Sequence, residues 1–326
     1  MDILIPGGTG QLGNVLTRAF TQSGNRVTQI GRNDWNSLQA AINHADVVIN
    51  LAGRSVNCRY TARNRQQIYD SRLSTTKAIG EVIRNAPNPP PLWLQMSTAT
   101  IYAHRYDAAN DEATGILGTT HDDVPETWRF SHDVALKWEH AATNEATPNT
   151  RKVLLRTAMV MSPDKNGVFD VLTTLVRRSL GGTNGDGRQY VSWIHEQDFV
   201  RAIAHLIDHP EIDGPVNLAS PNPLPNKDFM ATLRQVSGTR IGLPATNWML
   251  ELGALVLDTE TELILKSRRV IPGRLLDSGF TFGFPDWSTA ASVSQMLGAR
   301  WSTNFSEDAS MQSPRQRTPR AASSWA

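Results

Sequence analysis

The sequence is poor in the features that mark several classes of protein. Cys58 is the only cysteine, which excludes an intramolecular disulfide framework and a cysteine-based zinc cluster and fits a reducing compartment. Lysine and arginine number 32 against 31 acidic residues, so the net charge of +1 gives no electrostatic case for nucleic acid or a membrane surface. No apolar run approaches the roughly 18 residues of a membrane span, and MDILIPGG begins without a charged leader. We therefore expect a soluble, cytoplasmic protein.

Apolar runs bounded by Gly, Pro or Asn alternate with segments of helical spacing through the first half of the chain. The predicted strands are 2–7, 26–31, 46–53, 91–97 and 152–161. The predicted helices are 11–23, 35–43, 64–85 and 129–145. Strands that alternate with helices indicate parallel βαβ units, and nearly continuous apolar strands indicate a sheet covered on both faces. The sequence thus predicts an α/β protein with a Rossmann-type, doubly wound parallel sheet.

After about residue 163 the pattern becomes less regular. Gly-rich and Pro-rich stretches occur at 181–189 and 219–226, with helical patterns near 227–236 and 246–265. We expect a nucleotide-binding domain over 1–165, to which 190–220 returns, and a smaller substrate lobe with a helical C-terminal domain over 166–300. Residues 301–326 are rich in Ser, Arg, Pro and Gln and are predicted to be disordered.

A glycine-rich loop follows the first predicted strand in ILIPGGTGQLG. A tight turn and a close approach of the backbone to a pyrophosphate both exclude a Cβ atom, and the following helix presents free N–H groups to phosphates. A purely structural turn is the alternative, but the strand–turn–helix context favours a dinucleotide site. The predicted cofactor contacts of this loop are Gly7, Thr9, Gly10, Gln11, Leu12 and Gly13.

The end of the second predicted strand indicates which dinucleotide is bound. An NAD site places a carboxylate there for the ribose 2′-hydroxyl, whereas this chain has Arg32, which can pair with a 2′-phosphate. Asp34 lies close by, and Arg32 as a solvated turn residue is the alternative. We therefore predict NADP(H) as the cofactor.

The motifs GGTGQLG and VVINLAG resemble those of the short-chain dehydrogenase/reductase superfamily. QMSTATIYA is similar to the segment that ends the active-site strand in extended members such as sugar-nucleotide epimerases. The resemblance implies catalytic roles for Thr98 and Tyr102. It also implies cofactor contacts at Leu51, Ala52, Gly53, Ser97 and Arg156. For the Ser and Thr side chains, capping of their own backbone is the alternative.

The Tyr-x-x-x-Lys pair of that superfamily is missing. In FSHDVALKWE its positions read Phe130 and Val134, or Ser131 and Ala135 in the shifted frame. None of the five tyrosines is followed by Lys four residues later. Together with GGTNGDGRQYVSWIHEQDF, GPVNLASPNPLPNKDF and RVIPGRLLDSGFTFGFP, this departure resembles an atypical, epimerase-like branch without an established substrate.

Other polar residues are candidates for binding or structure. His132 is predicted at the surface, and Lys137 is predicted to pair with Asp133. In YVSWIHEQDF we expect Asp198 to cap a helix and to have a structural role together with Trp193. The predicted substrate contacts are Arg59, Arg72, Arg188 and Gln189, because such donors suit an anionic or carbonyl-bearing substrate. No cluster has metal-ligand spacing, so we expect no metal.

Two functions stay open from sequence. The first is an NADP(H)-dependent, epimerase-like oxidoreductase of a small polar substrate, with Thr98 through water, Tyr102 or the substrate's own group as proton source. The second is a non-catalytic NADP(H)-binding regulatory or redox-sensing protein, which the missing Tyr–Lys pair favours. In both we expect no nucleic-acid or membrane partner, and a homodimer stays open.

Overall fold

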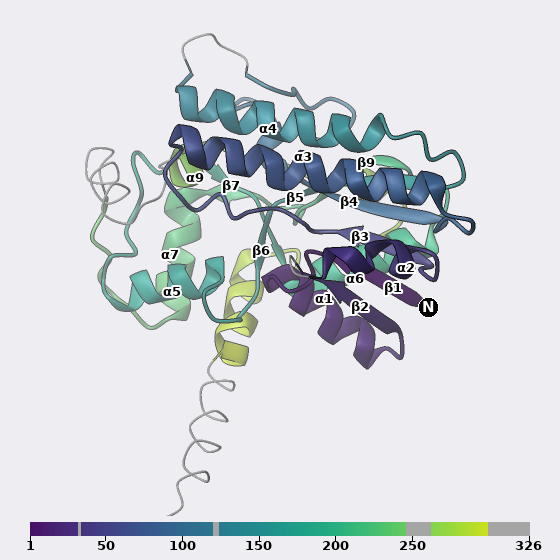
Figure 1. The fold of residues 1–326 in the computed structure, drawn as a ribbon. Helices are drawn as coiled ribbons and strands as arrows, with labels where there is room; N and C mark the ends of the chain where they lie inside the picture. Colours follow the sequence, from purple (N-terminus) through teal and green to yellow (C-terminus); the bar gives the residue numbers. More distant parts are fainter. Residues whose placement is uncertain (32–33, 120–123, 246–261, 299–326) are drawn as a thin grey trace, which may run out of the picture.

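A six-stranded, fully parallel sheet forms the centre of the computed structural model, which describes residues 1–31, 34–119, 124–245 and 262–298 (Figure 1). Its strand order is β2-β1-β3-β4-β5-β9. The strands are β1 (Asp2–Pro6), β2 (Arg26–Ile30), β3 (Val47–Asn50), β4 (Leu92–Thr98), β5 (Arg151–Thr157) and β9 (Gly214–Leu218). The predicted Rossmann-type fold is confirmed.

Helices cover both faces of this sheet. Figure 1 shows α3 (Ala62–Asn85) and α4 (Glu126–Thr143) on one face and α1 (Gln11–Gln22) and α6 (Glu196–Asp208) on the other. The short η1 (Trp35–Ser37) and α2 (Leu38–Ile42) follow β2, and η2 (Ala99–Ile101) follows β4. Helices on both faces explain why the central strands are almost wholly apolar.

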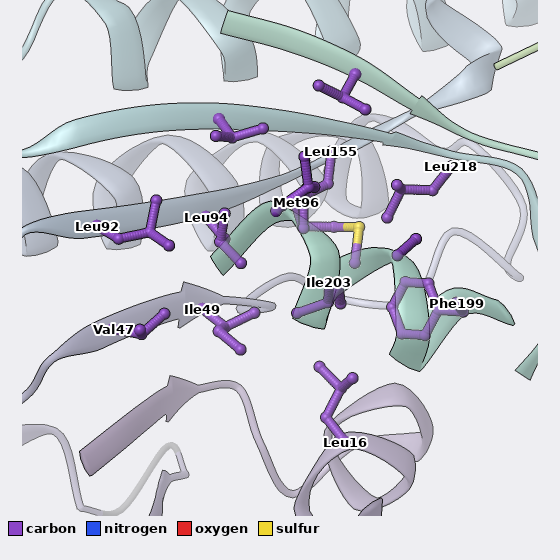
Figure 2. Packing of buried hydrophobic residues seen from close by; sticks show 14 of the residues in the cluster. Leu16, Val47, Ile49, Leu92, Leu94, Met96, Leu155, Phe199, Ile203 and Leu218 are labelled. Atoms are coloured by element: carbon purple, nitrogen blue, oxygen red, sulfur yellow. The ribbon is translucent and has the colours of Figure 1, made fainter. Parts of the chain in front are cut away.

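The larger hydrophobic core lies between the sheet and the α1–α6 layer. Leu16 of α1 and Phe199 and Ile203 of α6 pack toward Ile49 and Leu94 of the sheet (Figure 2). All five side chains are fully buried. Burial of one such side chain stabilises the fold by about 1.5–3 kcal/mol, so this layer fixes the sheet that carries the site.

The lobe beyond the sheet contains shorter elements, several of which contribute to a second core, whereas Leu275 of the last of them belongs to the larger one. They are β6 (Met159–Met161), α5 (Val168–Arg177), β7 (Tyr190–Val191), β8 (Trp193–His195), β10 (Leu224–Pro225), α7 (Asn226–Val236), α9 (Glu262–Leu265) and α10 (Gly273–Asp277). Residues 287–298 are also helical. Phe229 of α7 stacks on Trp287 with ring centroids 4.1 Å apart. This stacking joins the lobe to the C-terminal helix.

Two details of the predicted elements need correction. The predicted strand 152–161 divides at Ala158, after which β6 leaves the main sheet and pairs with β8. Asp198 is the third residue of α6 instead of its cap, because the His195 side chain accepts the capping hydrogen bond from the Gln197 amide. Most of the predicted helix 246–265 and the tail 301–326 lie outside the described residues, and the domain boundaries stay predictions.

A buried polar network joins the sheet to α4. Arg156 on β5 donates two hydrogen bonds to the Glu139 carboxylate of α4, both at 2.8 Å, and a third to the Tyr102 hydroxyl at 2.9 Å. Ser97 at the end of β4 donates to the same carboxylate at 2.6 Å. The Tyr102 hydroxyl donates to Asn217 of β9 at 2.9 Å. The network therefore fixes α4 over three neighbouring strands.

We predict that Glu139→Gln strongly destabilises the fold. The substitution leaves the buried Arg156 guanidinium without a countercharge, which costs on the order of 3–5 kcal/mol. Urea unfolding monitored by circular dichroism measures the loss. Lys137→Gln is the matched control on the same helix, because it breaks an ion pair whose lysine is 56% exposed. Equal stabilities of the two variants would contradict this account of the network.

Candidate functional site

A cleft of about 1220 Å³ opens at the carboxyl ends of β1, β2 and β3, beside α3. This edge is where open α/β sheets bind ligands. The cleft is lined by Gly7, Thr9, Gly10, Ile30, Gly31, Trp35, Leu51, Ala52, Gly53, Arg54, Gln67, Asp70, Ser71, Ser74, Thr75 and Ala78. Six of the predicted cofactor residues lie in this lining.

Three of the four glycines of the loop have different surroundings. Gly7 has φ of +78°, and a Cβ there would lie 2.6 Å from the backbone nitrogen of Ala52. A Cβ on Gly13 would lie 2.1 Å from the carbonyl oxygen of Gly8. A Cβ on Gly10 would meet only the Gly7 carbonyl oxygen, at 3.5 Å. Gly7 and Gly13 are thus required by the fold, whereas the space above Gly10 is left open on the cleft.

The first turn of α1 is an anion-binding feature of this cleft. Gly10 is the N-cap of α1 and supplies no side-chain cap, so the first N–H groups and the positive end of the helix dipole are left for a ligand. Arg54 adds a guanidinium to the lining, held by the Gln67 side chain. Sequence reasoning missed Arg54 and Trp35. Arg54 directly follows VVINLAG, which could have pointed to it.

The other predicted cofactor residues lie elsewhere. Gln11 borders a second cavity of about 870 Å³ between α1 and α5, and Leu12 packs against the main core. Arg32 lies outside the described residues, so the predicted contact with a 2′-phosphate stays a prediction. Ser97 and Arg156 belong to the buried network, with their polar atoms directed at Glu139. We therefore assign these two residues a structural role in holding α4.

The two predicted catalytic residues lie at the end of β4 but are not placed alike. Tyr102 is 2% exposed, its hydroxyl is held between Arg156 and Asn217, and burial raises its pKa. Its hydroxyl is thus engaged within the buried network, and its catalytic role stays a prediction. Thr98 caps η2 by accepting the Thr100 amide at 3.2 Å, which is the alternative considered from sequence.

The positions of the missing Tyr–Lys pair are filled by a hydrophobic cluster. Phe130 and Val134 of α4 are buried against Cys58, Tyr60 and Ile68. On this face of α4, packed apolar side chains therefore take the places of the phenol and the ammonium.

The four predicted substrate residues fall in two places. Arg72 is buried and donates to the Arg54 and Ile68 carbonyl oxygens, while its guanidinium lies over the Trp138 ring at 4.8 Å. Arg59 lies just before α3, and its carbonyl oxygen accepts from Asn64.

Arg188 and Gln189 lie in the lobe. The Arg188 guanidinium is 5.5 Å from the Tyr106 ring centroid, and Gln189 is buried and donates to the Asn184 carbonyl oxygen. Arg72 and Gln189 are thus largely engaged within the protein.

The surface position predicted for His132 is wrong. His132 is 3% exposed, and its Nε2 lies 2.5 Å from the ammonium of Lys266, which also donates to the Thr100 carbonyl oxygen at 2.7 Å. Burial, together with the charges of Lys266 and Arg268, lowers the pKa of His132 to about 3. The segment at 262–270 covers this side of α4, which helical periodicity could not reveal.

A polar cluster at this contact was missed from sequence altogether. Ser131 donates to Glu262 and lies 3.5 Å from the Tyr60 hydroxyl. The Glu262 carboxylate lies 3.7 Å from Arg268 and 4.0 Å from Lys266. Burial and the neighbouring Arg268 lower the pKa of Lys266, while Glu262 opposes the shift.

The remaining predictions for this region concern structure. The ion pair between Lys137 and Asp133 is present at 2.8 Å, so that prediction is confirmed. Asp198 is buried and accepts the backbone amides of Gly283 and Phe284 at 2.8 and 2.7 Å. It therefore pins the C-terminal segment to α6, as its predicted structural role requires.

Comparison with known families agrees with this geometry. The model of the NAD dependent epimerase/dehydratase family matches residues 3–219, which include the glycine loop, the cleft and the end of β4. The chain belongs to the NAD dependent epimerase/dehydratase family. A domain of unknown function, DUF1731, matches residues 245–292 and so contains Glu262, Lys266 and Arg268. The predicted resemblance to epimerase-like short-chain enzymes is confirmed.

Relatives within the epimerase/dehydratase family align over nearly the whole chain. Epimerase family protein YfhF of Bacillus subtilis is 30% identical over 318 residues, covering 92% of this chain and 99% of the relative. The crystal structure of human epimerase family protein SDR39U1 with NADPH has a TM-score of 0.80 at 27% identity, covering 90% and 98% of the two chains. A nucleoside-diphosphate sugar epimerase from Corynebacterium glutamicum shares the fold, with a TM-score of 0.69 at 23% identity.

Over the described ranges, no three His, Cys, Asp or Glu side chains gather as metal ligands. Within the same ranges, no helix has the length and apolar character to cross a membrane.

We predict that His132 makes the fold sensitive to acid. Its pKa is lowered from 6.5 to about 3 in the folded protein, so the unfolded chain binds the extra proton as pH falls through this window. The free energy of unfolding should therefore fall between pH 6.5 and 3, and His132→Gln should reduce this slope. His140→Gln, at an exposed position of the same helix, is the control. Urea unfolding at a series of pH values measures the slope, and identical slopes for His132→Gln and wild type would contradict the assignment.

Proposed function

We propose that this chain binds NADPH in the cleft and uses it to reduce a small polar carbonyl compound. The observation that carries the proposal is the open space above Gly10, at an uncapped helix N-terminus, in a cleft large enough for a dinucleotide. The family match and the NADPH bound to human SDR39U1 support the choice of cofactor. NADPH, when bound, supplies a hydride.

Different residues of the cleft would bind different parts of the cofactor. The aromatic Trp35, beside Ile30 and Gly31, suits the adenine ring. The first N–H groups of α1 and the Arg54 guanidinium suit phosphate oxygens. The hydroxyls of Ser71, Ser74 and Thr75 on α3 offer further hydrogen bonds along the wall of the cleft.

A non-catalytic NADP(H)-binding protein is the second candidate. The packed Phe130–Val134 face of α4 favours it, because the usual proton donor of the superfamily is replaced by apolar side chains. For both candidates we propose a cytoplasmic protein with a small-molecule ligand and no nucleic-acid partner, and the homodimer stays open.

We predict that Gly10→Val abolishes NADPH binding in a folded protein. The valine side chain would extend into the open space above the helix N-terminus, where a phosphate needs close approach to the backbone. Isothermal calorimetry measures the affinity, and circular dichroism monitors the fold. Gly13→Ala is the contrasting variant, because its Cβ would collide with the Gly8 carbonyl oxygen and destabilise the loop itself. Full NADPH affinity in folded Gly10→Val would refute the cleft as the phosphate site.

We predict that the wild-type protein consumes NADPH with at least one polar carbonyl compound. The purified chain is incubated with NADPH and a panel of aldehydes, ketones and quinones, and the absorbance of the reduced nicotinamide is followed. Gly10→Val is the control for oxidation outside the site. Tight NADPH binding without turnover on any member of the panel would favour the non-catalytic candidate.

A further inference from the structure

Two tyrosines flank the position at which α4 lacks its phenol. The rings of Tyr60 and Tyr69 both pack edge-on against Phe130, with centroids at 4.8 and 5.3 Å. Their hydroxyl groups have different surroundings. The Tyr69 hydroxyl donates to Asp133, and the ammonium of Lys137 lies 5.1 Å from the Tyr69 ring centroid, on the partly exposed side of α4. The Tyr60 hydroxyl lies 3.5 Å from Ser131 Oγ, at the edge of the polar cluster.

Tyr60 is held firmly in this place. It directly precedes Thr61, the N-cap of α3, whose hydroxyl accepts the Asn64 amide at 3.2 Å. Arg65 donates to the Tyr60 carbonyl oxygen at 2.8 Å. The side chain is 7% exposed. A phenol that transfers a proton needs such a fixed orientation, because a small misplacement costs much of the rate.

The superfamily has the lysine of its Tyr–Lys pair on α4. In this chain two cations lie on the 262–270 segment. Arg268 and Lys266 lie on either side of Glu262, and both are anchored on Thr100, through its hydroxyl at 3.1 Å and its carbonyl oxygen at 2.7 Å. Burial lowers the pKa of Arg268, while the nearby Glu262 and Tyr60 raise it. By geometry, Arg268 lies 3.7 Å from the Glu262 carboxylate, which accepts from Ser131, and Ser131 Oγ lies 3.5 Å from the Tyr60 hydroxyl.

A second guanidinium connects Tyr60 to the cofactor cleft. Burial lowers the pKa of Arg72 to about 10, and charge interaction with Tyr60 opposes this shift. The Arg72 guanidinium donates to the carbonyl oxygen of Ile68, which packs in one cluster with Tyr60. On its other side, the Arg72 guanidinium carbon lies 3.4 Å from the place of a Cβ on Gly53, which lines the cleft. Arg72 therefore joins the cluster that contains Tyr60 to the lining of the cleft.

We propose that Tyr60 is the proton donor of this protein, and that Arg268 and Lys266 of the DUF1731 domain replace the lysine of the missing pair. The inference rests on the proposed carbonyl reduction. The Tyr60 O–H bond breaks as its proton forms a bond to the carbonyl oxygen, while the carbonyl carbon takes both electrons of the hydride that NADPH supplies. The phenolate that remains is held by the neighbouring guanidinium groups and recovers a proton from water.

We predict that Tyr60→Phe lowers kcat by about 100-fold or more, the usual contribution of a general acid, and leaves NADPH affinity within about twofold. Tyr69→Phe is the matched control, because it removes a phenol that packs on the same Phe130 ring and should keep kcat near that of wild type. The assay is NADPH consumption with the panel compound that turns over best, alongside calorimetry of NADPH binding. A Tyr60→Phe enzyme with wild-type kcat would overturn the inference.

A second readout needs no substrate. In protein labelled with 3-fluorotyrosine, NADPH alone should shift the fluorine NMR resonance of residue 60 and leave that of residue 69 in place. Phe variants of the other four tyrosines assign the residue 60 signal by elimination. This measurement tests the role of Tyr60 even if Tyr60→Phe fails to fold. NADPH that binds without moving the residue 60 signal would overturn the role of Tyr60 alone. A chain that does not bind NADPH would overturn the proposed function and this inference with it.

Discussion

The buried ion pair between Arg156 and Glu139 is the interaction on which the arrangement of the site depends. Both side chains are nearly excluded from water, and the carboxylate also accepts the Ser97 hydroxyl. Such a pair is tolerated in the interior only when nearly all of its hydrogen-bonding capacity is used. Through Tyr102 the guanidinium reaches Asn217, whose side-chain amide donates to the Ile271 carbonyl oxygen. One network therefore ties the central sheet to α4 and to the C-terminal segment.

This constraint accounts for the unusual distribution of polar groups around α4. The network holds the helix from the sheet side, while another of its faces forms a hydrophobic contact around Phe130. The adjoining face meets the C-terminal segment, which brings Glu262, Lys266 and Arg268 against Ser131 and His132. In our proposal, Tyr60 and the 262–270 segment supply the groups that the superfamily places on one helix.

The sequence alone allows prediction of those parts of the molecule whose structure depends on residues close together in the chain. The strand–loop–helix unit around Gly7, Gly10 and Gly13 could be predicted because an apolar run, the glycines and a helical pattern follow one another in the sequence. The central strands followed from apolar runs that only a doubly covered sheet explains. The burial of His132 could not be foreseen, because its partner Lys266 is 134 positions away. The hydrogen bonds of Tyr102 could not be foreseen for the same reason, since its partners Arg156 and Asn217 lie on strands far along the chain.

The central claim is that the reacting end of the cofactor faces groups from outside α4. A crystal structure of the full chain with NADPH tests it most directly. The account predicts that the adenosine half lies beside Trp35 and Gly10 and that the nicotinamide ring lies on the side of the Tyr60 hydroxyl. A nicotinamide ring remote from Tyr60, with another acidic group against its reactive carbon, would contradict it.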